Sequence, residues 1–105
     1  MDAVTAVSGS GPAYFYFLVE VLIEAGRREG MPADVARDLA IQTARGAVEM
    51  MDKENVPPEE LRRRVTSKAG TTEAAFRRIE ELKVRESLLD AVAAAARRAR
   101  ELGKK

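Results

Sequence analysis

Cysteine and histidine are both missing from the 105 residues. Without cysteine the chain can form no disulfide, no thiolate zinc site and no thiol nucleophile. Without histidine it has no imidazole base, no Ser–His pair and none of the nitrogen ligands common in metal sites. We therefore predict no metal site and no catalytic residues of the chain's own. Any chemistry must rest on hydroxyls, backbone amides or a bound cofactor.

Aromatic residues are scarce, at 5%, and 18 basic side chains against 17 acidic ones leave a net charge of only +1. Such a balance gives no reason to expect a nucleic acid or an anionic membrane as a partner. We also find no unbroken run of about 20 apolar residues and no basic segment followed by an apolar run at the start. The expectation is a cytoplasmic protein without membrane or nucleic-acid partners.

Apolar residues make up 46% of the chain and charged residues 33%, which is typical of a folded, soluble protein. They recur at intervals of three and four and not of two, which predicts an all-α fold. The length fits a single domain, residues 1–105, with no nucleotide-binding domain. Because the core must be built mainly from aliphatic residues and alanine, we expect association with further copies to bury more surface.

The most distinct predicted helix runs from about residue 12 to residue 29. Ser10 or Gly11 can serve as its N-cap, Pro12 suits its first turn, and Gly30 is a left-handed C-terminal cap. Its apolar side chains are expected along one broad face: Tyr14, Phe15, Leu18, Val21, Leu22 and Ala25.

A second helix should begin at Pro32 and end between Asp52 and Asn55, and a short third helix should run from the Pro57–Pro58 pair to about Val65. The inner face of the second helix is predicted to contain Ala36, Leu39, Ala40, Thr43, Ala47, Met50 and Met51.

The last helical pattern runs from Thr72 to Leu102, with Thr71 and Thr72 as capping residues. It carries two apolar stripes that differ by roughly 150° around the helix axis. The first stripe contains Ala75, Phe76, Ile79 and Leu82, and the second contains Leu88, Val92, Ala95, Ala96 and Ala99. Either the chain breaks between Leu82 and Val84, or one continuous helix faces two different partners. We predict the continuous helix, bridging two subunits.

Three short motifs have both a structural and a functional interpretation. Gly9-x-Gly11 lacks the preceding strand and the third glycine of a nucleotide-binding loop, so a helix entrance explains it better. The basic residues near the C-terminus interact favourably with a helix dipole and lack an aromatic stacking platform for nucleic acid. Residues 67–72 form either a simple helix cap or an anion site made by amides at a helix N-terminus.

The segment DAVTAVSGSGPAY at residues 2–14 resembles the opening of the C-terminal domain of pyrroline-5-carboxylate reductases. Further segments match this family in the same order: AG at 25–26, GMP at 30–32, QT at 42–43, GA at 46–47, VTS at 65–67, GTTEAA at 70–75, DAV at 90–92 and RAREL at 98–102. The resemblance covers essentially the whole chain.

This resemblance implies a helical bundle that forms an intertwined homodimer or a higher oligomer. In the family a separate domain binds NADPH or NADH, and hydride passes to the imine carbon of pyrroline-5-carboxylate to give proline. The resemblance therefore implies that this chain binds no cofactor and is inactive by itself, while a proline-like carboxylate is its expected ligand.

The resemblance also assigns two groups of site residues. The amides of Gly70 and Thr71 correspond to those that hold the substrate carboxylate, and Thr72 corresponds to the threonine near the imine nitrogen. The cofactor-proximal group, which corresponds to residues lining the nicotinamide end, contains Ser8, Gly9, Ser10, Gly11 and Pro12.

The chain departs from the family pattern in two places. Lys68 and Ala69 stand where the family has proline and glycine, which predicts weaker substrate binding, and Leu82 and Lys83 stand where it has two glycines. Both changes replace helix breakers with helix formers. The alternative hypothesis is therefore an engineered helical oligomer scaffold without a biological ligand.

Overall fold

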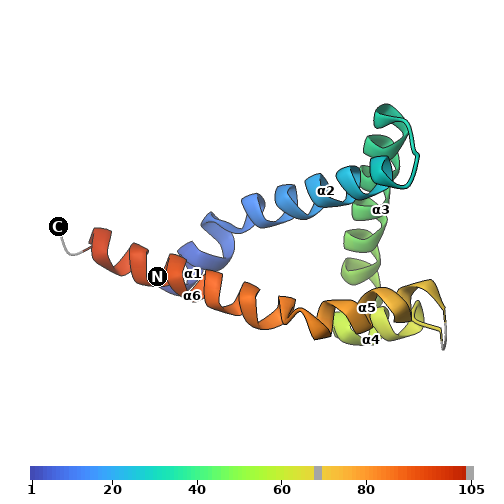
Figure 1. Ribbon diagram of the computed structural model, residues 1–105. Coiled ribbons are helices and arrows are strands. Elements are labelled where there is room, and N and C mark those ends of the chain that lie inside the picture. The colour runs from blue at the N-terminus through green and yellow to red at the C-terminus, as the bar shows by residue number, and fades with distance from the viewer. Residues whose placement is uncertain (68–69, 104–105) are drawn as a thin grey trace. The chain divides into compact units, whose positions relative to one another are not determined.

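The computed structural model describes residues 1–67 and 70–103, and this part of the chain contains helices and no strands (Figure 1). Its elements are α1 (Asp2–Val4), the π-helix η1 (Thr5–Gly9), α2 (Gly11–Arg28), α3 (Ala33–Glu54), α4 (Pro58–Arg64), α5 (Thr71–Glu81) and α6 (Val84–Gly103). The all-α prediction is confirmed. The chain divides into two compact units: unit 1 contains Met1–Tyr14 and the chain from Thr66 onward, and unit 2 contains Phe15–Val65.

Helix α2 matches the predicted first helix within one residue at each end, and two short helical elements that were not predicted, α1 and η1, precede it. Ser10 has helical backbone angles, φ −86° and ψ −16°, and therefore does not act as an N-cap. Its amide donates to the Thr5 carbonyl at 2.8 Å, which is the i→i−5 hydrogen bond of a π-helix. Pro12 provides the physical reason, because it has no N–H and its ring crowds the carbonyl four residues earlier. A widened turn upstream of the ring accommodates it.

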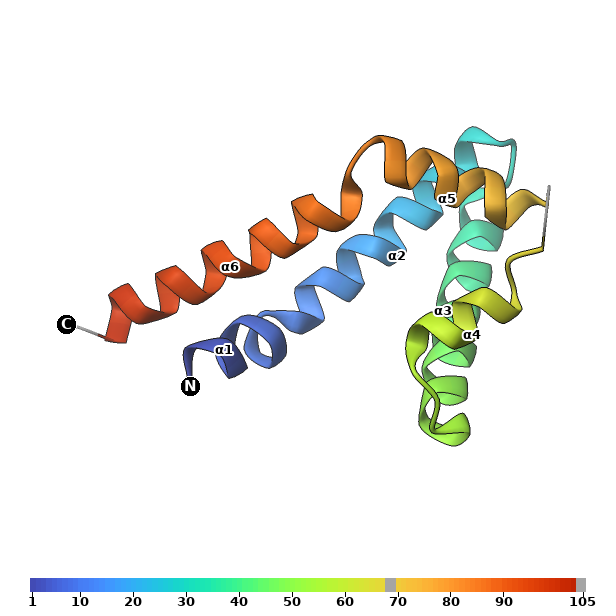
Figure 2. The same cartoon turned by 90° about the horizontal axis from the view of Figure 1, so that it is seen from below.

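Unit 1 is held together by helix α6, which packs against α1 and η1 (Figures 1 and 2). Ala6 of η1 is only 1% exposed. The half-buried residues of this part of α6 are spaced three and four apart: Val92, Ala95, Ala96 and Ala99. This is the predicted second stripe without Leu88, which is exposed. The small side chains let the helices approach closely.

Helices α5 and α6 are separate, so the prediction of one continuous helix through residues 82–84 is wrong. Helix α5 ends at Glu81, and Lys83 adopts a left-handed conformation with φ +55° before α6 begins at Val84. The Lys83 amide donates to the Glu80 carbonyl at 3.1 Å, and the Lys83 carbonyl accepts from both the amide and the hydroxyl of Ser87. Figure 2 shows the bend. The difference in phase between the stripes therefore outweighs the helix propensity of Leu82 and Lys83.

Lys83→Gly should raise the free energy of unfolding by about 0.5–1 kcal/mol. A left-handed conformation costs a residue with a Cβ about 1–2 kcal/mol, and the greater freedom of glycine in the unfolded chain offsets part of this gain. The ion pair that would be lost, Lys83 Nζ to Glu86 Oε2 at 4.0 Å, is exposed and contributes little. Urea unfolding would measure the change. Lys83→Ala is the control, and equal stability of the glycine and alanine variants would contradict the prediction.

In unit 2, helix α2 ends in a Schellman motif, as the glycine at position 30 predicted. Gly30 has φ +98°, its amide donates to the Arg27 carbonyl at 3.0 Å, and the Met31 amide donates to the Gly26 carbonyl at 3.0 Å. Helices α2 and α3 meet closely beyond this turn. A Cβ placed on Gly26 would lie 3.3 Å from the Cβ of Ala36, so glycine at position 26 allows the two helices to pack this closely.

Helices α3 and α4 match the predicted bounds. Helix α3 ends at Glu54, followed by Asn55 in a left-handed conformation with φ +51°, and Pro57 precedes the first residue of α4. Arg64 Nη1 lies 3.0 Å from Glu54 Oε1, which joins the ends of the two helices. Both side chains are largely exposed, so this ion pair contributes at most about 1 kcal/mol.

The hydrophobic core of the single chain is very small. Among the described residues only three apolar side chains are buried, namely those of Ala6, Ala36 and Ala40. The predicted inner faces of α2 and α3 are largely exposed instead, including Phe15, Leu18, Val21, Leu22, Leu39, Met50 and Met51. Helix α2 is apolar on nearly all sides, and such a helix is normally surrounded by other helices.

Within residues 1–67 and 70–103, one helical stretch, Asp2–Arg28, is long and apolar enough to cross a membrane. It was not expected from the sequence, because polar and small residues interrupt the apolar segment. Only 11% of its most apolar window is buried. A helix that packs inside an oligomer passes the same test of length and composition, so this observation by itself is weak evidence for a membrane span.

Candidate functional site

The first group of predicted site residues lies at the N-terminus of α5. Gly70 is the N-cap in an extended conformation, and its carbonyl accepts the first helical hydrogen bond from Ala74 at 3.1 Å. Thr71 and Thr72 are the first two residues of the helix, so the prediction that their side chains cap it is wrong. Amides in this first turn have no acceptor within the helix, which suits them to bind a carboxylate.

The charge beside these amides is partly neutralised. Glu73, in the same turn, would repel a bound anion, but its Oε1 accepts a hydrogen bond from Arg77 Nη2 at 3.1 Å. The pair spans one helical turn (i, i+4), so the positive charge stays on the same side of α5 as the carboxylate. The helix dipole adds a partial positive charge at this end. Together these effects favour one negatively charged group.

Gly70 is required by close contacts with Ser67. The Gly70 amide donates to the Ser67 carbonyl at 3.1 Å. A Cβ on Gly70 would overlap the Ser67 hydroxyl and would lie 3.2 Å from the Ser67 carbonyl oxygen. Lys68 and Ala69, the two departures from the family pattern, lie outside the described residues.

Gly70→Ala should lower the free energy of unfolding by about 1–2 kcal/mol, because the loop must shift to admit the methyl group. Combining it with Ser67→Ala removes the overlapping hydroxyl and should restore at least half of the loss. Urea unfolding of the two single variants and the double variant measures the coupling between the two positions. Strict additivity of the two changes would show that the contact is absent.

The second group, Ser8–Pro12, forms the junction of η1 and α2 in unit 1. The Tyr14 hydroxyl donates a hydrogen bond to the Ala6 carbonyl at 3.0 Å, which connects the residues on either side of this junction. Gly11 is buried, but a Cβ built on it would meet no atom within 4 Å.

The single chain does not bring the two groups of site residues together. Helix α5 contacts the start of α6, while η1 packs elsewhere along α6, and α5 and η1 do not contact each other within the described residues. Helix α6 has 20 residues and therefore extends about 30 Å. One chain thus presents an amide-rich helix end and a glycine-rich junction as separate sites.

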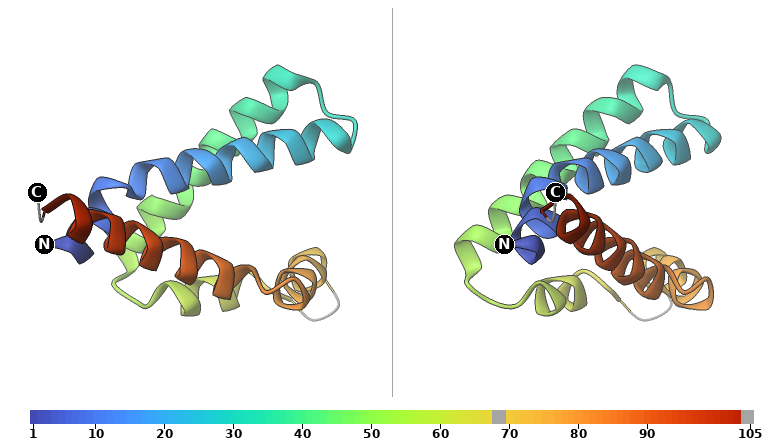
Figure 3. Two further views of the ribbon diagram at one scale, coloured as in Figure 1. Left: turned by 60° about the vertical axis from the view of Figure 1, so that its left-hand side comes forward. Right: turned by 90° about the vertical axis from the view of Figure 1, so that its left-hand side faces the viewer.

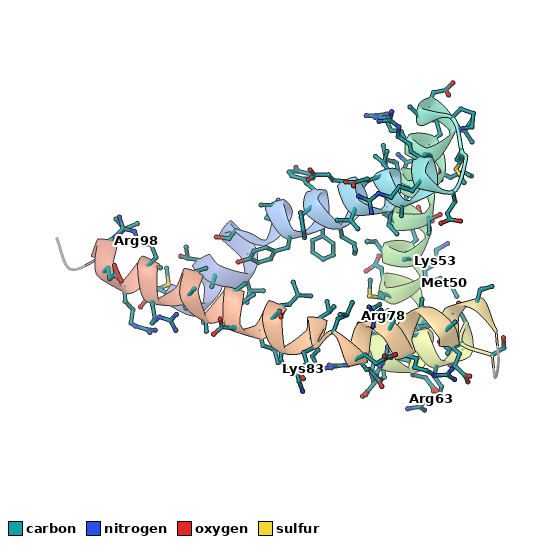
Figure 4. The ribbon with its side chains drawn as sticks, viewed as in Figure 1. Met50, Lys53, Arg63, Arg78, Lys83 and Arg98 are labelled. Atoms are coloured by element: carbon teal, nitrogen blue, oxygen red, sulfur yellow. The ribbon has the colours of Figure 1, made fainter. Side chains whose placement is uncertain are left out.

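Unit 2 carries two apolar grooves that the sequence reasoning did not identify. The first has a volume of about 350 Å³ between α3 and α4, with Met50 of α3 on its wall (Figure 4). It is lined by Ala47, Met50, Met51, Pro58, Leu61, Arg62, Arg64 and Val65. The second, of about 500 Å³, lies along α2 and α3 and is lined by Phe15, Tyr16, Val19, Glu20, Ile23, Arg37, Ile41 and Ala44.

The signal for these grooves was present in the sequence as apolar residues on more than one face of α2 and α3. The prediction used one stripe for each helix and left Val19, Ile23 and Ile41 unassigned. Within residues 1–67 and 70–103, no group of three or more acidic side chains is placed to hold a metal ion. Toward the end of α6, Arg98 (labelled in Figure 4) forms an ion pair with Glu101 at 3.1 Å. Figure 3 shows α6 from two further sides, and Lys104 and Lys105 lie outside the described residues.

Over the described residues, these features define a class of protein: an all-α domain that exposes most of its large apolar side chains and has a helix N-terminus, that of α5, without a side-chain cap. The family described as pyrroline-5-carboxylate reductase dimerisation matches residues 1–102. The chain is 44% identical over 105 residues to the pyrroline-5-carboxylate reductase of Synechocystis, covering all of this chain and 39% of the relative. It is 48% identical over 104 residues to that of Corynebacterium melassecola, covering 99% of this chain and 38% of the relative.

The fold agrees with a crystal structure of Plasmodium falciparum pyrroline carboxylate reductase with NADP bound. The TM-score is 0.93 at 35% identity, over 98% of this chain and 39% of that one. The chain belongs to the pyrroline-5-carboxylate reductase dimerisation family. It spans about two fifths of the length of the relatives that it matches.

Proposed function

We propose that this chain is the dimerisation and substrate-binding domain of a pyrroline-5-carboxylate reductase and forms one domain over residues 1–105. The observation that carries the proposal is the family match over residues 1–102, which includes both groups of site residues. The exposed apolar surface supports the dimerisation role. The amide-rich start of α5 supports the substrate-binding role.

In this proposal the substrate carboxylate binds the amides of Gly70 and Thr71. The Thr72 hydroxyl, two residues from the N-cap, forms a hydrogen bond with the ring nitrogen of the imine. These groups hold the substrate in one orientation and supply no acid or base of their own, which agrees with the absence of histidine and cysteine.

The nicotinamide cofactor, NADPH or NADH, would supply hydride for the imine carbon when it is bound to a separate nucleotide-binding domain, and the ring nitrogen would take its proton from solvent. Ser8–Pro12 would line its nicotinamide end, and this chain's part would be to shape that contact. Cytoplasmic localisation and the absence of a membrane partner belong to the same proposal.

Self-association is the second part of the proposal. Large apolar side chains on α2 and α3 are exposed in the single chain, and fully burying each such side chain contributes about 1.5–3 kcal/mol. We propose an intertwined homodimer in which the apolar grooves of one copy receive helices of the other. In the dimer, the two separate groups of site residues would be completed by surfaces beyond the single chain.

A chimaeric enzyme tests the catalytic part. Residues 1–102 of this chain replace the matching C-terminal segment of the Corynebacterium melassecola relative, and oxidation of NADPH or NADH by pyrroline-5-carboxylate is followed. The proposal predicts turnover by the chimaera and saturable binding of proline by the isolated chain. An engineered scaffold without a ligand predicts neither, so a folded but inactive chimaera together with no proline binding would refute the proposal.

A further inference from the structure

We infer that Tyr14 is a positioning residue whose hydroxyl fixes the conformation of the Ser8–Pro12 segment. Its Oη donates to the Ala6 carbonyl at 3.0 Å, across eight residues of sequence. The bond is partly buried, and Ala6 is 1% exposed, so water competes poorly for the carbonyl. The bond thus joins the two ends of the segment that contains the predicted cofactor-proximal residues.

The bond acts on a turn that has an alternative conformation. A π-helix is rare and occurs mostly as a single turn, because a regular α-helix is normally the more stable conformation. If η1 relaxed to an α-helix, Ser10 would donate to the Ala6 carbonyl and not to the Thr5 carbonyl, which it now contacts at 2.8 Å. The Tyr14 hydroxyl already takes one of the two acceptor positions of that Ala6 carbonyl. It therefore competes with the hydrogen bond that the relaxed turn would need.

Gly9, which is exposed, indicates that the shape of the segment serves a group outside the chain. Gly9 and Gly11 both lack a positive φ, and a Cβ on Gly9 would only make an ordinary contact with Thr5 Cγ2 at 3.6 Å. A Cβ on Gly11 would meet nothing within 4 Å. Neither the backbone nor the packing of this chain requires glycine at these positions. At the exposed Gly9, the missing side chain suits the close approach of a ligand to the backbone, whereas Gly11 is buried.

The role in the cofactor contact rests on the proposed function, because the dinucleotide is assigned to this segment by that proposal. A π-turn beside a ligand contact is a common arrangement, since the widened turn exposes backbone groups at a fixed place. Loss of the Tyr14 hydroxyl should therefore weaken the contact with the nicotinamide and leave the carboxylate contact at the start of α5 unchanged.

The first experiment uses the 105-residue chain and amide hydrogen exchange measured by NMR. Tyr14→Phe should speed exchange at Ser8–Ser10 by about tenfold and leave the amides of α3 unchanged. Tyr16→Phe is the matched control. Tyr16 is 73% exposed, and this substitution removes a hydroxyl of the same kind two residues away. Unchanged exchange at Ser8–Ser10 in the Tyr14 variant would overturn the inference.

The second experiment introduces Tyr14→Phe into the chimaeric enzyme. We expect the KM for the dinucleotide to rise about fivefold to tenfold, as for the loss of one hydrogen bond, while the KM for pyrroline-5-carboxylate changes less than twofold. Equal changes in both constants, or none, would overturn the positioning role. If the unmutated chimaera is folded but inactive and the isolated chain binds no proline, the proposed function fails, and the exchange measurement alone decides whether Tyr14 holds the turn.

Discussion

Phe17→Asp should abolish the folded assembly at micromolar concentration. Phe17 is 59% exposed in the single chain, and a polar substitution at a truly exposed site changes stability by only about 0.5 kcal/mol. If a second copy covers α2, the same change buries a carboxylate in an apolar interface and removes a buried aromatic ring, at a combined cost of several kcal/mol. That cost is comparable to the total stability of a small domain.

Sedimentation and circular dichroism would show the result. We expect the parent chain to be a helical dimer or larger assembly and the Phe17→Asp chain to be a largely unfolded monomer. Arg27→Gln, also on α2 and also exposed, is the control and should leave the mass and the helix content unchanged. A folded, monomeric parent chain would contradict both this prediction and the dimerisation proposal.

Thr72→Val in the chimaeric enzyme should lower kcat/KM by about 10-fold to 100-fold. Valine has nearly the same shape and keeps the backbone amide but lacks the hydroxyl that we assign to the imine nitrogen. A hydrogen bond to a charged or strongly polar group is worth about 1.5–3 kcal/mol, which corresponds to this range. Reductase kinetics with pyrroline-5-carboxylate as the varied substrate would measure it.

Thr71→Val is the matched control for this prediction. Thr71 precedes Thr72 in the same helical turn, and our assignment uses only its amide, which valine retains. Its kcat/KM should therefore stay within about threefold of the parent value. Equal losses at the two positions would show that the substitutions act through the local fold and would remove Thr72 from the proposed site.

Local rules predicted the helix ends that depend on one or two residues. Gly30 and Asn55 both end helices in left-handed conformations, and Pro57 and Pro58 mark the start of α4. In each case a short-range steric property determines the backbone, so the residue type alone carries the information.

The errors concern features in which several interactions compete. At Leu82–Lys83 the helix propensity favoured continuity, but the tertiary arrangement of the two stripes required a bend, at the cost of a left-handed lysine. At Ser10 the motif predicted an N-cap, but this residue has helical backbone angles between the end of η1 and the start of α2.

The inner faces of α2 and α3 were predicted from one stripe per helix. They remain exposed because the single chain does not contain enough protein to cover them. For the candidate site, the pattern allowed either a helix cap or an anion site at the start of α5, and its assignment to a substrate came from the family resemblance. The Tyr14 bond depends on a three-dimensional contact that spacing in the sequence does not encode.

The near absence of buried side chains in the single chain has a kinetic consequence for the proposed homodimer. A subunit that leaves its partner retains little beyond Ala6, Ala36 and Ala40 to hold it folded, so dissociation and unfolding become one event. Subunit exchange between two folded dimers can then be no faster than unfolding, whose half-life for small domains ranges from about a second or less to days. Mixed dimers of two variants should form readily when the chains are synthesised together and only slowly when the purified dimers are combined.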